Sequence, residues 1–265
     1  LLLISFFGEW YLMANSGWKK FVAVGDNHGA LGCKKTLRAL IKFCDQWKPD
    51  LKIHLGDCFD FAGLRSGISS DDSAAADDLS EDFFYGFQFL TEFEPDVYLL
   101  GNHEDRLWRI AGSHSNGMMR LAADNCIDRI ETYCKKLKTK LIPYHAEAGL
   151  HSEANGNLIF LHGYSANANA VKEHATHYAA MGGSVIMGHL HRVEIQTGKR
   201  QGGSHGYSAG CMADFSKMDY AKNRLATAGW ENAFAFGVYK GESVNVWIAR
   251  KCGTKWLLPT GMEEF

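Results

Sequence analysis

The sequence predicts an α/β fold with one large hydrophobic core. Hydrophobic residues make up 46% of the 265 residues, which is enough for one or two domains with a sizeable interior. Several short apolar runs end in glycine beside a polar residue, as buried strands do. A segment of helical periodicity separates the first two runs, so strand and helix alternate along the chain.

Five apolar runs are expected to be strands, because Val, Ile and Leu favour extended structure and glycine marks a turn. They are residues 21–26 (FVAVGD), 51–57 (LKIHLGD), 96–102 (DVYLLGN), 157–163 (NLIFLHG) and 184–191 (SVIMGHLH). Between the first two, residues 34–47 place Leu37, Leu40, Ile41 and Cys44 on one face of a helix. This order predicts a strand–helix–strand unit.

After residue 200 the pattern changes to strands that follow one another closely. Residues 233–240 and 243–250 are separated by Gly241 and Glu242, which predicts a β-hairpin with a two-residue turn. With residues 205–212 they indicate a second sheet. The economical arrangement is two sheets packed face to face with helices outside.

Two stretches interrupt the strands. Residues 62–95 join an acidic piece (SSDDSAAADDLSED) to an aromatic run (FFYGFQFL), which we expect to be a loop leading into a core-facing helix. Residues 105–150 form a second insert, largely helical up to residue 140. No linker divides the chain, so we expect residues 13–265 to form a single domain. The apolar residues 1–12, which precede Met13, are expected to be a non-native or disordered extension.

Composition excludes several classes of protein. A net charge of -2 disfavours a strongly basic nucleic-acid-binding module. Seven cysteines without C-x-x-C spacing indicate reduced thiols in a cytoplasmic protein rather than a disulfide framework. The apolar N-terminal run is too short to span a bilayer, so no association with a membrane is expected.

Candidate metal ligands lie where the apolar runs end, because the carboxyl ends of strands in an α/β sheet form the ligand crevice. Oxygen and imidazole donors without thiolate suit Mn, Fe, Zn or a similar divalent ion. The number of donors fits two ions that share the carboxylate of Asp57. One ion would bind Asp26, His28, Asp57 and His191, and the other would bind Asp57, Asn102, His162 and His189. The adjacent glycines would allow sharp turns and leave room for substrate.

Each of these motifs is common by itself: D-x-H is usually a turn, and GDxxD is often a helix cap. All five in this order, each at the end of an apolar run, are hard to obtain by chance. Together they resemble the calcineurin-like metallophosphoesterase superfamily. Its ordered pattern D-x-H, GDxxD, GNH[ED], H and GHxH is complete here as Asp26/His28, Asp57/Asp60, Asn102/His103/Glu104, His162 and His189/His191.

The resemblance covers residues 21 to about 211 and implies a four-layer α/β/β/α sandwich of two mixed sheets, two divalent ions and phosphoester hydrolysis. A hydroxide that bridges the ions would attack phosphorus, so no side-chain nucleophile is needed. His103 would protonate the leaving oxygen as the general acid. By the same resemblance, Asp60 would hydrogen-bond His103 and favour its protonated form. Manganese is the ion expected to support activity.

One departure from the family pattern bears on the substrate. Protein phosphatases of the superfamily carry Arg directly after the second Asp of GDxxD, where Phe61 stands here, so a phosphoprotein substrate is disfavoured. Arg65, Arg106 and Arg109 are candidate replacements that would contact phosphate through paired hydrogen bonds. The alternative for all three is a solvated position on a helix.

Two other functions stay open at this point. The repair-nuclease branch of the superfamily has the same ligands, although the acidic insert and the net charge disfavour a long polyanion. A non-catalytic binding scaffold of the same fold is disfavoured by the complete ligand set. We therefore expect a small phosphomonoester or phosphodiester as the substrate. Of the other histidines, His54 is expected in the core, and His174 and His177 in packing or at the surface.

Overall fold

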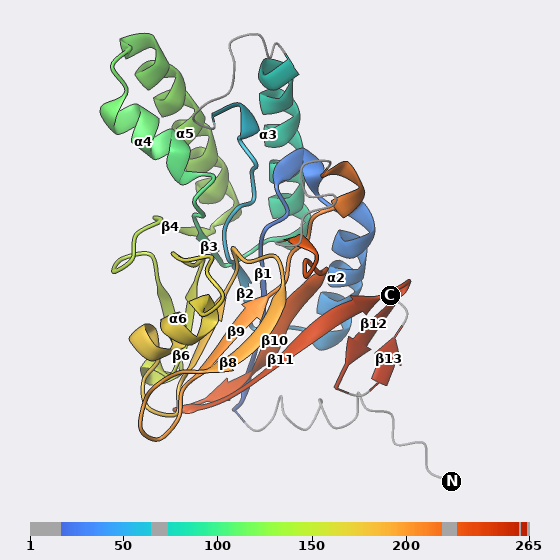
Figure 1. The fold of residues 1–265 in the computed structure, drawn as a ribbon. Helices are drawn as coiled ribbons and strands as arrows, with labels where there is room; N and C mark the ends of the chain where they lie inside the picture. Colours follow the sequence, from blue (N-terminus) through green and yellow to red (C-terminus); the bar gives the residue numbers. More distant parts are fainter. Residues whose placement is uncertain (1–16, 65–73, 219–226, 260, 264–265) are drawn as a thin grey trace.

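Two β-sheets pack face to face, with helices on the outer face of each sheet (Figure 1). The structure is a computed structural model. It describes residues 17–64, 74–218, 227–259 and 261–263. The predicted fold class, an α/β/β/α sandwich of two mixed sheets, is confirmed. Residues 1–12 and Arg65, for which the sequence gives expectations, lie outside the described residues.

The larger sheet has eight strands in the order β13-β12-β11-β10-β1-β2-β3-β4. Its parallel half comprises β1 (Lys19–Val24), β2 (Leu51–His54), β3 (Val97–Leu99) and β4 (Lys140–Ile142). Its antiparallel half comprises β10 (Ala233–Lys240), β11 (Ser243–Cys252), β12 (Lys255–Leu258) and β13 (Gly261–Glu263). The two halves meet where β10 pairs antiparallel with β1.

The smaller sheet has five strands in the order β5-β6-β7-β9-β8. They are β5 (His151–Glu153), β6 (Leu158–Leu161), β7 (Ser184–Met187), β8 (Val193–Thr197) and β9 (His205–Ala209). Strands β6, β7 and β9 are parallel, whereas β5 and β8 run antiparallel at the edges.

The predicted hairpin exists, but its predicted place in a second sheet was wrong. Residues 233–240 and 243–252 extend the larger sheet, and only 205–209 belongs to the smaller one. Seven successive residues of β10 are buried, so this strand needs neighbours on both edges and cover on both faces. A place between β1 and β11 provides both.

The helices cover the outer faces. On the larger sheet lie α2 (Lys34–Trp47), α3 (Ala74–Phe93), α4 (Asp105–Ser113) and α5 (Gly117–Leu137), and on the smaller sheet lies α6 (Ala170–Tyr178). The predicted helix over 34–47 is confirmed at both ends. The expected helical content of 105–140 is confirmed by α4 and α5. Short 3-10 turns occur at Gly29–Leu31, Ala62–Leu64, Ala154–Gly156 and Phe215–Lys217.

Alternation along β1 separates two hydrophobic cores. Phe21 and Ala23 face the smaller sheet, where Phe21 meets Phe160 edge to face with ring centroids 5.4 Å apart. Val22 and Val24 face the opposite way, toward α2 and α3. Strand side chains alternate between the faces of a sheet, so one apolar strand contributes to both cores.

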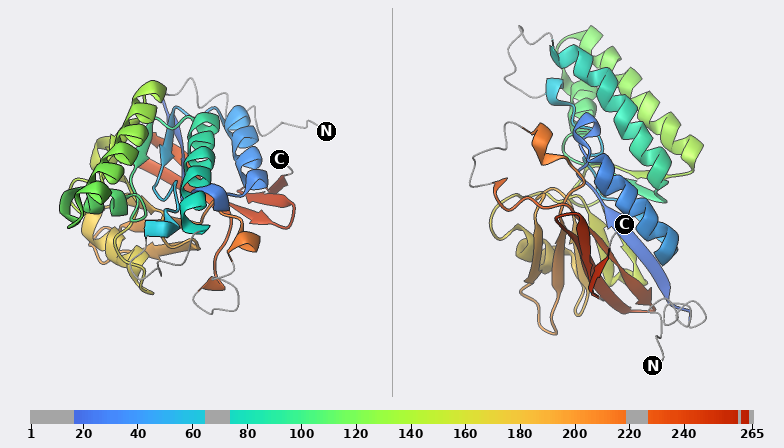
Figure 2. Two further views of the ribbon diagram at one scale, coloured as in Figure 1. Left: turned by 90° about the horizontal axis from the view of Figure 1, so that it is seen from above. Right: turned by 90° about the vertical axis from the view of Figure 1, so that its right-hand side faces the viewer.

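The aromatic run of the first insert packs as expected. Phe83 and Phe89 of α3 are buried, and Phe87 stacks on Tyr133 of α5 at 4.2 Å. Helices α3 and α5 therefore lie side by side, as the teal and green helices show in Figure 2. All seven cysteines are free. Among the helices that the structure describes, none is long and apolar enough to cross a membrane.

We predict that Phe160→Ala lowers the free energy of unfolding by about 3–5 kcal/mol, because it leaves a cavity between the two sheets. Urea denaturation followed by tryptophan fluorescence measures the change. The control is Ile195→Ala on β8, where the side chain is 60% exposed and the expected change is within about 0.5 kcal/mol. Equal losses in the two variants would contradict this account of the core.

Candidate metal centre

The loops after β1, β2 and β3 of the larger sheet meet those after β6 and β7 of the smaller sheet. Five of the proposed ligands have left-handed backbone, with φ of 56° at Asp26, 51° at His28, 51° at Asp57, 69° at His189 and 57° at His191. This conformation costs about 1–3 kcal/mol for a residue other than glycine. The surrounding contacts therefore hold each ligand in a conformation that it would not adopt alone.

Two glycines beside the site make room for side chains of the protein, whereas the sequence predicts that they leave room for a substrate. A Cβ atom on Gly101 would lie 2.0 Å from Oδ1 of Asp57, and one on Gly188 would lie 2.6 Å from Oδ2 of Asp26. The space freed by these two glycines is thus filled by ligand carboxylates rather than left for a substrate.

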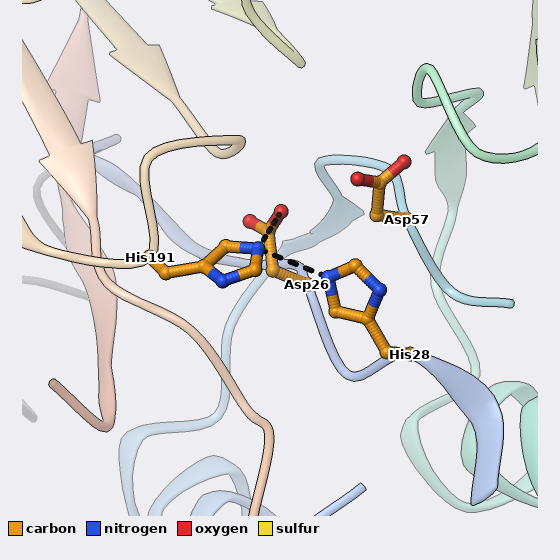
Figure 3. A group of neighbouring side chains, drawn as sticks. All are labelled: Asp26, His28, Asp57 and His191. Atoms are coloured by element: carbon orange, nitrogen blue, oxygen red, sulfur yellow. Dashed lines mark hydrogen bonds and ion pairs between the residues drawn. The ribbon is translucent and has the colours of Figure 1, made fainter. Parts of the chain in front are cut away.

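Four of the predicted ligands form one buried group, which consists of Asp26, His28, Asp57 and His191 (Figure 3). Each offers one ligand atom, and these atoms lie within 4.8 Å of one another. Nε2 of His191 lies 2.9 Å from Nε2 of His28 and 3.3 Å from Oδ1 of Asp26. Two imidazole nitrogens and a carboxylate oxygen aimed at one point form a donor set that suits a divalent ion.

A second group contains Asp57, His162 and His189, again with one atom from each within 4.8 Å. Oδ1 of Asn102 lies 3.0 Å from Nε2 of His162 and adds an oxygen donor beside this group. Nδ1 of His162 bonds the carbonyl oxygen of Leu55 at 2.9 Å. This bond fixes the ring and directs Nε2 into the site, as second partners of metal-binding histidines do. Asp57 belongs to both groups, in the arrangement that the sequence predicts.

The electrostatics of the cluster keep its carboxylates ionised. Burial raises the pKa values of Asp26 and Asp57, but hydrogen bonds and charges of the histidines bring both below their usual range. Burial opposes a charge on His162, but the Asp57 carboxylate and its hydrogen bond raise the pKa of His162 to about 9. Burial and the neighbouring His162 lower the pKa of His189 to about 4, which keeps the His189 ring neutral. The site therefore holds ionised carboxylates, whose negative charge is balanced by the protonated ring of His162.

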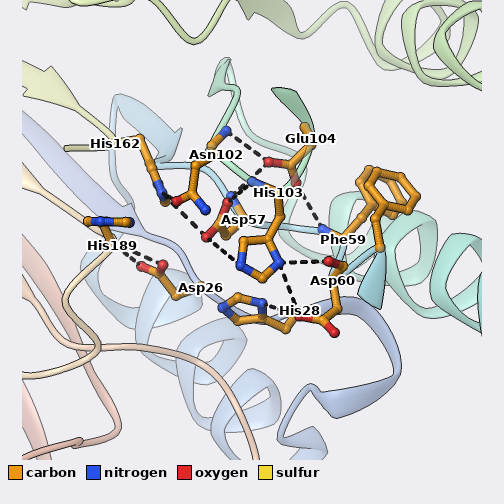
Figure 4. A network of polar contacts seen from close by, with 12 residues as sticks. Asp26, His28, Asp57, Phe59, Asp60, Asn102, His103, Glu104, His162 and His189 are labelled. Carbon is orange, nitrogen blue, oxygen red and sulfur yellow. Dashed lines mark hydrogen bonds and ion pairs between the residues drawn. The ribbon is translucent and has the colours of Figure 1, made fainter. Parts of the chain in front are cut away.

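His103 lies beside this cluster and is linked to it through Asp60 (Figure 4). Nδ1 of His103 lies 2.6 Å from the carbonyl oxygen of Asp60 and 3.1 Å from its carboxylate oxygen Oδ1. The same Oδ1 lies 2.9 Å from Nδ1 of His28. The predicted pairing of Asp60 with His103 is present, and Asp60 also orients the proposed ligand His28. Nε2 of His103 is turned toward Asp57, 3.7 Å from Oδ2.

Glu104 has a supporting role that the sequence analysis did not assign. Its fully buried carboxylate accepts hydrogen bonds from the backbone N–H groups of Asp57, Phe59 and Gly101 at 2.8–3.1 Å. The hydroxyl of Tyr98 donates a fourth bond at 2.8 Å. The only sequence signal was the last letter of GNHE, which completes the family pattern but does not show which groups it binds.

Asp82 is a second support that the sequence analysis missed. This buried residue of α3 accepts hydrogen bonds from the backbone N–H groups of Asp60 at 3.1 Å and Phe61 at 2.6 Å. A Cβ atom on Gly29 would lie 1.7 Å from its Oδ1, so Gly29 admits the carboxylate to the loop after β1. Burial raises the pKa of Asp82 to about 6. At least this residue of the acidic piece contacts the site loops instead of repelling a substrate.

The two described candidate arginines, Arg106 and Arg109, have different surroundings. Nη1 of Arg106 donates to the carbonyl oxygens of Asp60 at 3.0 Å and Phe61 at 3.3 Å, so it supports the loop that carries Asp60. Arg109 pairs with Asp105 at 2.9 Å on the surface of α4, where its side chain is 67% exposed. Arg106 thus lies next to the predicted site, and Arg109 occupies a solvated helix position.

Two of the remaining histidines have structural partners, in line with expectation. His54 is buried, and its Nε2 lies 2.8 Å from Oδ1 of Asn27 in the loop after β1. Nδ1 of His174 lies 2.6 Å from the carbonyl oxygen of Ala170, while its Nε2 accepts the N–H of Tyr164 at 2.9 Å. These bonds connect the core and α6 to the site loops.

The fold and the buried His/Asp groups together define a metallophosphoesterase-type protein. Residues 19–193 match the model of the calcineurin-like phosphoesterase family, and the chain belongs to that family. A comparison with curated proteins gives no match.

Solved structures of similar fold share little sequence with the chain. Vacuolar protein sorting 29 from Cryptosporidium parvum is 11% identical with a TM-score of 0.48, over 94% of this chain and 98% of that one. A metallophosphoesterase from Sphaerobacter thermophilus is 15% identical with a TM-score of 0.45, over 89% and 88%. The phosphoesterase Yfce from E. coli is 12% identical with a TM-score of 0.41, over 86% and 98%.

We predict that Glu104→Gln destabilises the protein by about 2 kcal/mol or more. The amide NH2 of glutamine would face backbone N–H groups, whose hydrogen bonds a carboxylate oxygen now accepts. Urea denaturation measures the loss, and isothermal titration with Mn²⁺ should show metal affinity reduced by about 10- to 100-fold. The control is Glu131→Gln on α5, whose partly exposed side chain pairs only with Lys135 in the same helix. Unchanged stability and metal affinity in Glu104→Gln would show that the four bonds do not support the site.

Proposed function

We propose that this protein is a metal-dependent phosphoesterase that hydrolyses small phosphomonoesters or phosphodiesters. One observation carries the proposal: a buried donor group and a partly buried one share Asp57, and His103 lies directly beside them. The intact and mutually oriented donor set favours an enzyme over a binding scaffold of the same fold.

The donor set fits two divalent ions, of which we propose manganese. Asp26, His28, Asp57 and His191 would hold one ion, and Asp57, Asn102, His162 and His189 would hold the other. Two such ions lower the pKa of a water molecule and neutralise the oxygens of a phosphoryl group. His28 and His162 bond through Nδ1 to oxygens of the protein, which leaves Nε2 of each ring for an ion.

The chain itself would supply the proton for the leaving group. The Asp60 carboxylate and the Asp57 charge raise the pKa of His103 despite the opposing effect of its burial. Nδ1 of His103 is occupied by Asp60, so Nε2 is the nitrogen available to a substrate oxygen. We assign to His103 the role of general acid and to Asp60 that of holding the imidazole in position.

The burial of Phe61 favours a small substrate over a phosphoprotein. Its side chain is buried and stacks on Phe59 with ring centroids 5.3 Å apart and planes 13° apart. It also packs against Phe83 of α3. The position where protein phosphatases of the family carry an arginine therefore faces the hydrophobic core, where it cannot contact a phosphate.

We predict that Asp57→Asn loses both ions, because the shared carboxylate belongs to both donor groups. Elemental analysis after dialysis against Mn²⁺ should give two metals per chain for the unaltered protein and close to none for the variant. Asp128→Asn, at an exposed position of α5, serves as the control. Two metals per chain in Asp57→Asn would exclude the shared role of Asp57.

We also predict that His103→Asn retains metal but loses turnover on poor leaving groups. Hydrolysis of glycerol 2-phosphate should fall by about 10²–10⁴-fold, because the leaving alkoxide then has no proton donor. Hydrolysis of p-nitrophenyl phosphate, whose leaving group needs no proton, should fall much less. Equal rates of variant and unaltered protein on glycerol 2-phosphate would remove the general-acid role. If the unaltered protein with Mn²⁺ hydrolyses no phosphoester in a panel of monoesters and diesters, the proposed function itself is wrong.

A further inference from the structure

Three partly buried tyrosines form a row that begins at the metal centre. The ring of Tyr144 lies 5.8 Å from the ring of His162, and Tyr164 lies 5.0 Å from Tyr144. Tyr178 lies 6.2 Å from Tyr164 and ends helix α6. We call Tyr144, Tyr164 and Tyr178 the tyrosine row. It starts beside the second donor group and runs away from it toward α6.

Hydrogen bonds fix two of the rings. The Tyr144 hydroxyl donates to the carbonyl oxygen of Gly163 at 3.0 Å. The Tyr164 hydroxyl lies within donating distance of two carbonyl oxygens, that of His145 at 2.8 Å and that of Gly149 at 3.2 Å. The backbone N–H of Tyr164 is held by His174. These bonds set the ring positions without a ligand, so little conformational freedom would be lost when one binds.

The row combines apolar rings with nearby positive charge. All three rings are partly exposed, whereas the core residue Tyr98 is fully buried. Tyr178 also borders a hollow of about 780 Å³. Three basic residues line this hollow, Lys172, Lys199 and Arg200, against one acidic residue, Glu173. Flat rings next to a phosphoester site suit the stacking of an aromatic base, and the basic hollow suits further phosphate.

We propose that the near end of the tyrosine row, at Tyr144, binds the base of a nucleotide while its phosphate lies at the metal centre. This inference rests on the proposed function, because that function places the phosphate. Hydrolysis would add water to phosphorus and break the bond between phosphorus and the nucleoside oxygen. The nucleoside oxygen would take the proton of His103, phosphate and nucleoside would leave, and the proton released by the attacking water would restore His103. A free nucleotide and the end of a single strand share this chemistry.

The test compares adenosine 5′-monophosphate with ribose 5-phosphate, which carries a hydroxyl in place of the base. Isothermal titration uses the Mn²⁺-loaded His103→Asn protein to limit turnover. One stacked base is worth about 5- to 150-fold in affinity, so adenosine 5′-monophosphate should bind at least about fivefold more tightly. Adding Tyr144→Leu should weaken adenosine 5′-monophosphate by about fivefold or more and leave ribose 5-phosphate unchanged.

Tyr144→Phe is the matched control, because it keeps the ring and should keep the preference for the base. Circular dichroism verifies that each variant is folded. Equal affinities for the two ligands in the background protein would overturn the proposal. It would also fail if Tyr144→Leu weakened both ligands equally, since that result indicates a packing role alone.

The two proposals fail in different ways. Hydrolysis of glycerol 2-phosphate by the unaltered protein, without any preference for the base, rejects the tyrosine row and leaves the phosphoesterase intact. A preference for the base that depends on the row, with no phosphoester hydrolysed, rejects the enzyme and retains the binding site. Thymidine monophosphate and a 5′-phosphorylated thymidine tetramer then separate the two sources. Tighter binding of the tetramer would identify the end of a strand as the ligand, and equal binding would identify a free nucleotide.

Discussion

Four hydrogen bonds hold the buried carboxylate of Glu104 in the loop after β3, and the two from the N–H groups of Asp57 and Phe59 join this loop to the loop after β2. The bond from the Asp57 N–H supports the left-handed backbone at Asp57, and Oδ1 of Asp57 in turn accepts the N–H of His103. The shared carboxylate and the proposed general acid are thus fixed relative to each other by backbone contacts. Without these bonds the strain at Asp57 would be relieved by movement of the loop, and the two donor groups would lose their common member.

A second layer of polar residues extends this support to the other loops. Asp82 joins α3 to the loop that carries Asp60, and Asn27 joins His54 to the carbonyl oxygen of Cys58. Burial lowers the pKa of His54 to about 3, so this ring stays neutral and serves as a fixed hydrogen-bonding link. Buried polar groups of this kind are stable only when each has a partner. The centre is therefore preorganised before any ion or substrate arrives.

Local patterns explain what the sequence predicts correctly. The helix over residues 34–47 follows from its apolar face, and the clustering of the Asp and His side chains follows from polar residues placed after apolar strands. Long-range pairing explains what it does not. Nothing within residues 233–250 shows that this hairpin pairs with β1 rather than with the smaller sheet. Glu104 and Asp82 bind N–H groups of loops more than twenty residues away, and such partners leave no mark in a local pattern. The tyrosine row likewise joins residues whose nearness depends on the packing of α6.

The central claim is that Asp57 lies between two ions at the ends of both sheets. Anomalous diffraction from crystals grown with Mn²⁺, recorded near the manganese absorption edge, tests it most directly. The account predicts two peaks in each chain, one beside Asp26, His28 and His191 and one beside Asn102, His162 and His189, with Asp57 in contact with both. A single peak, or peaks away from Asp57, would contradict it.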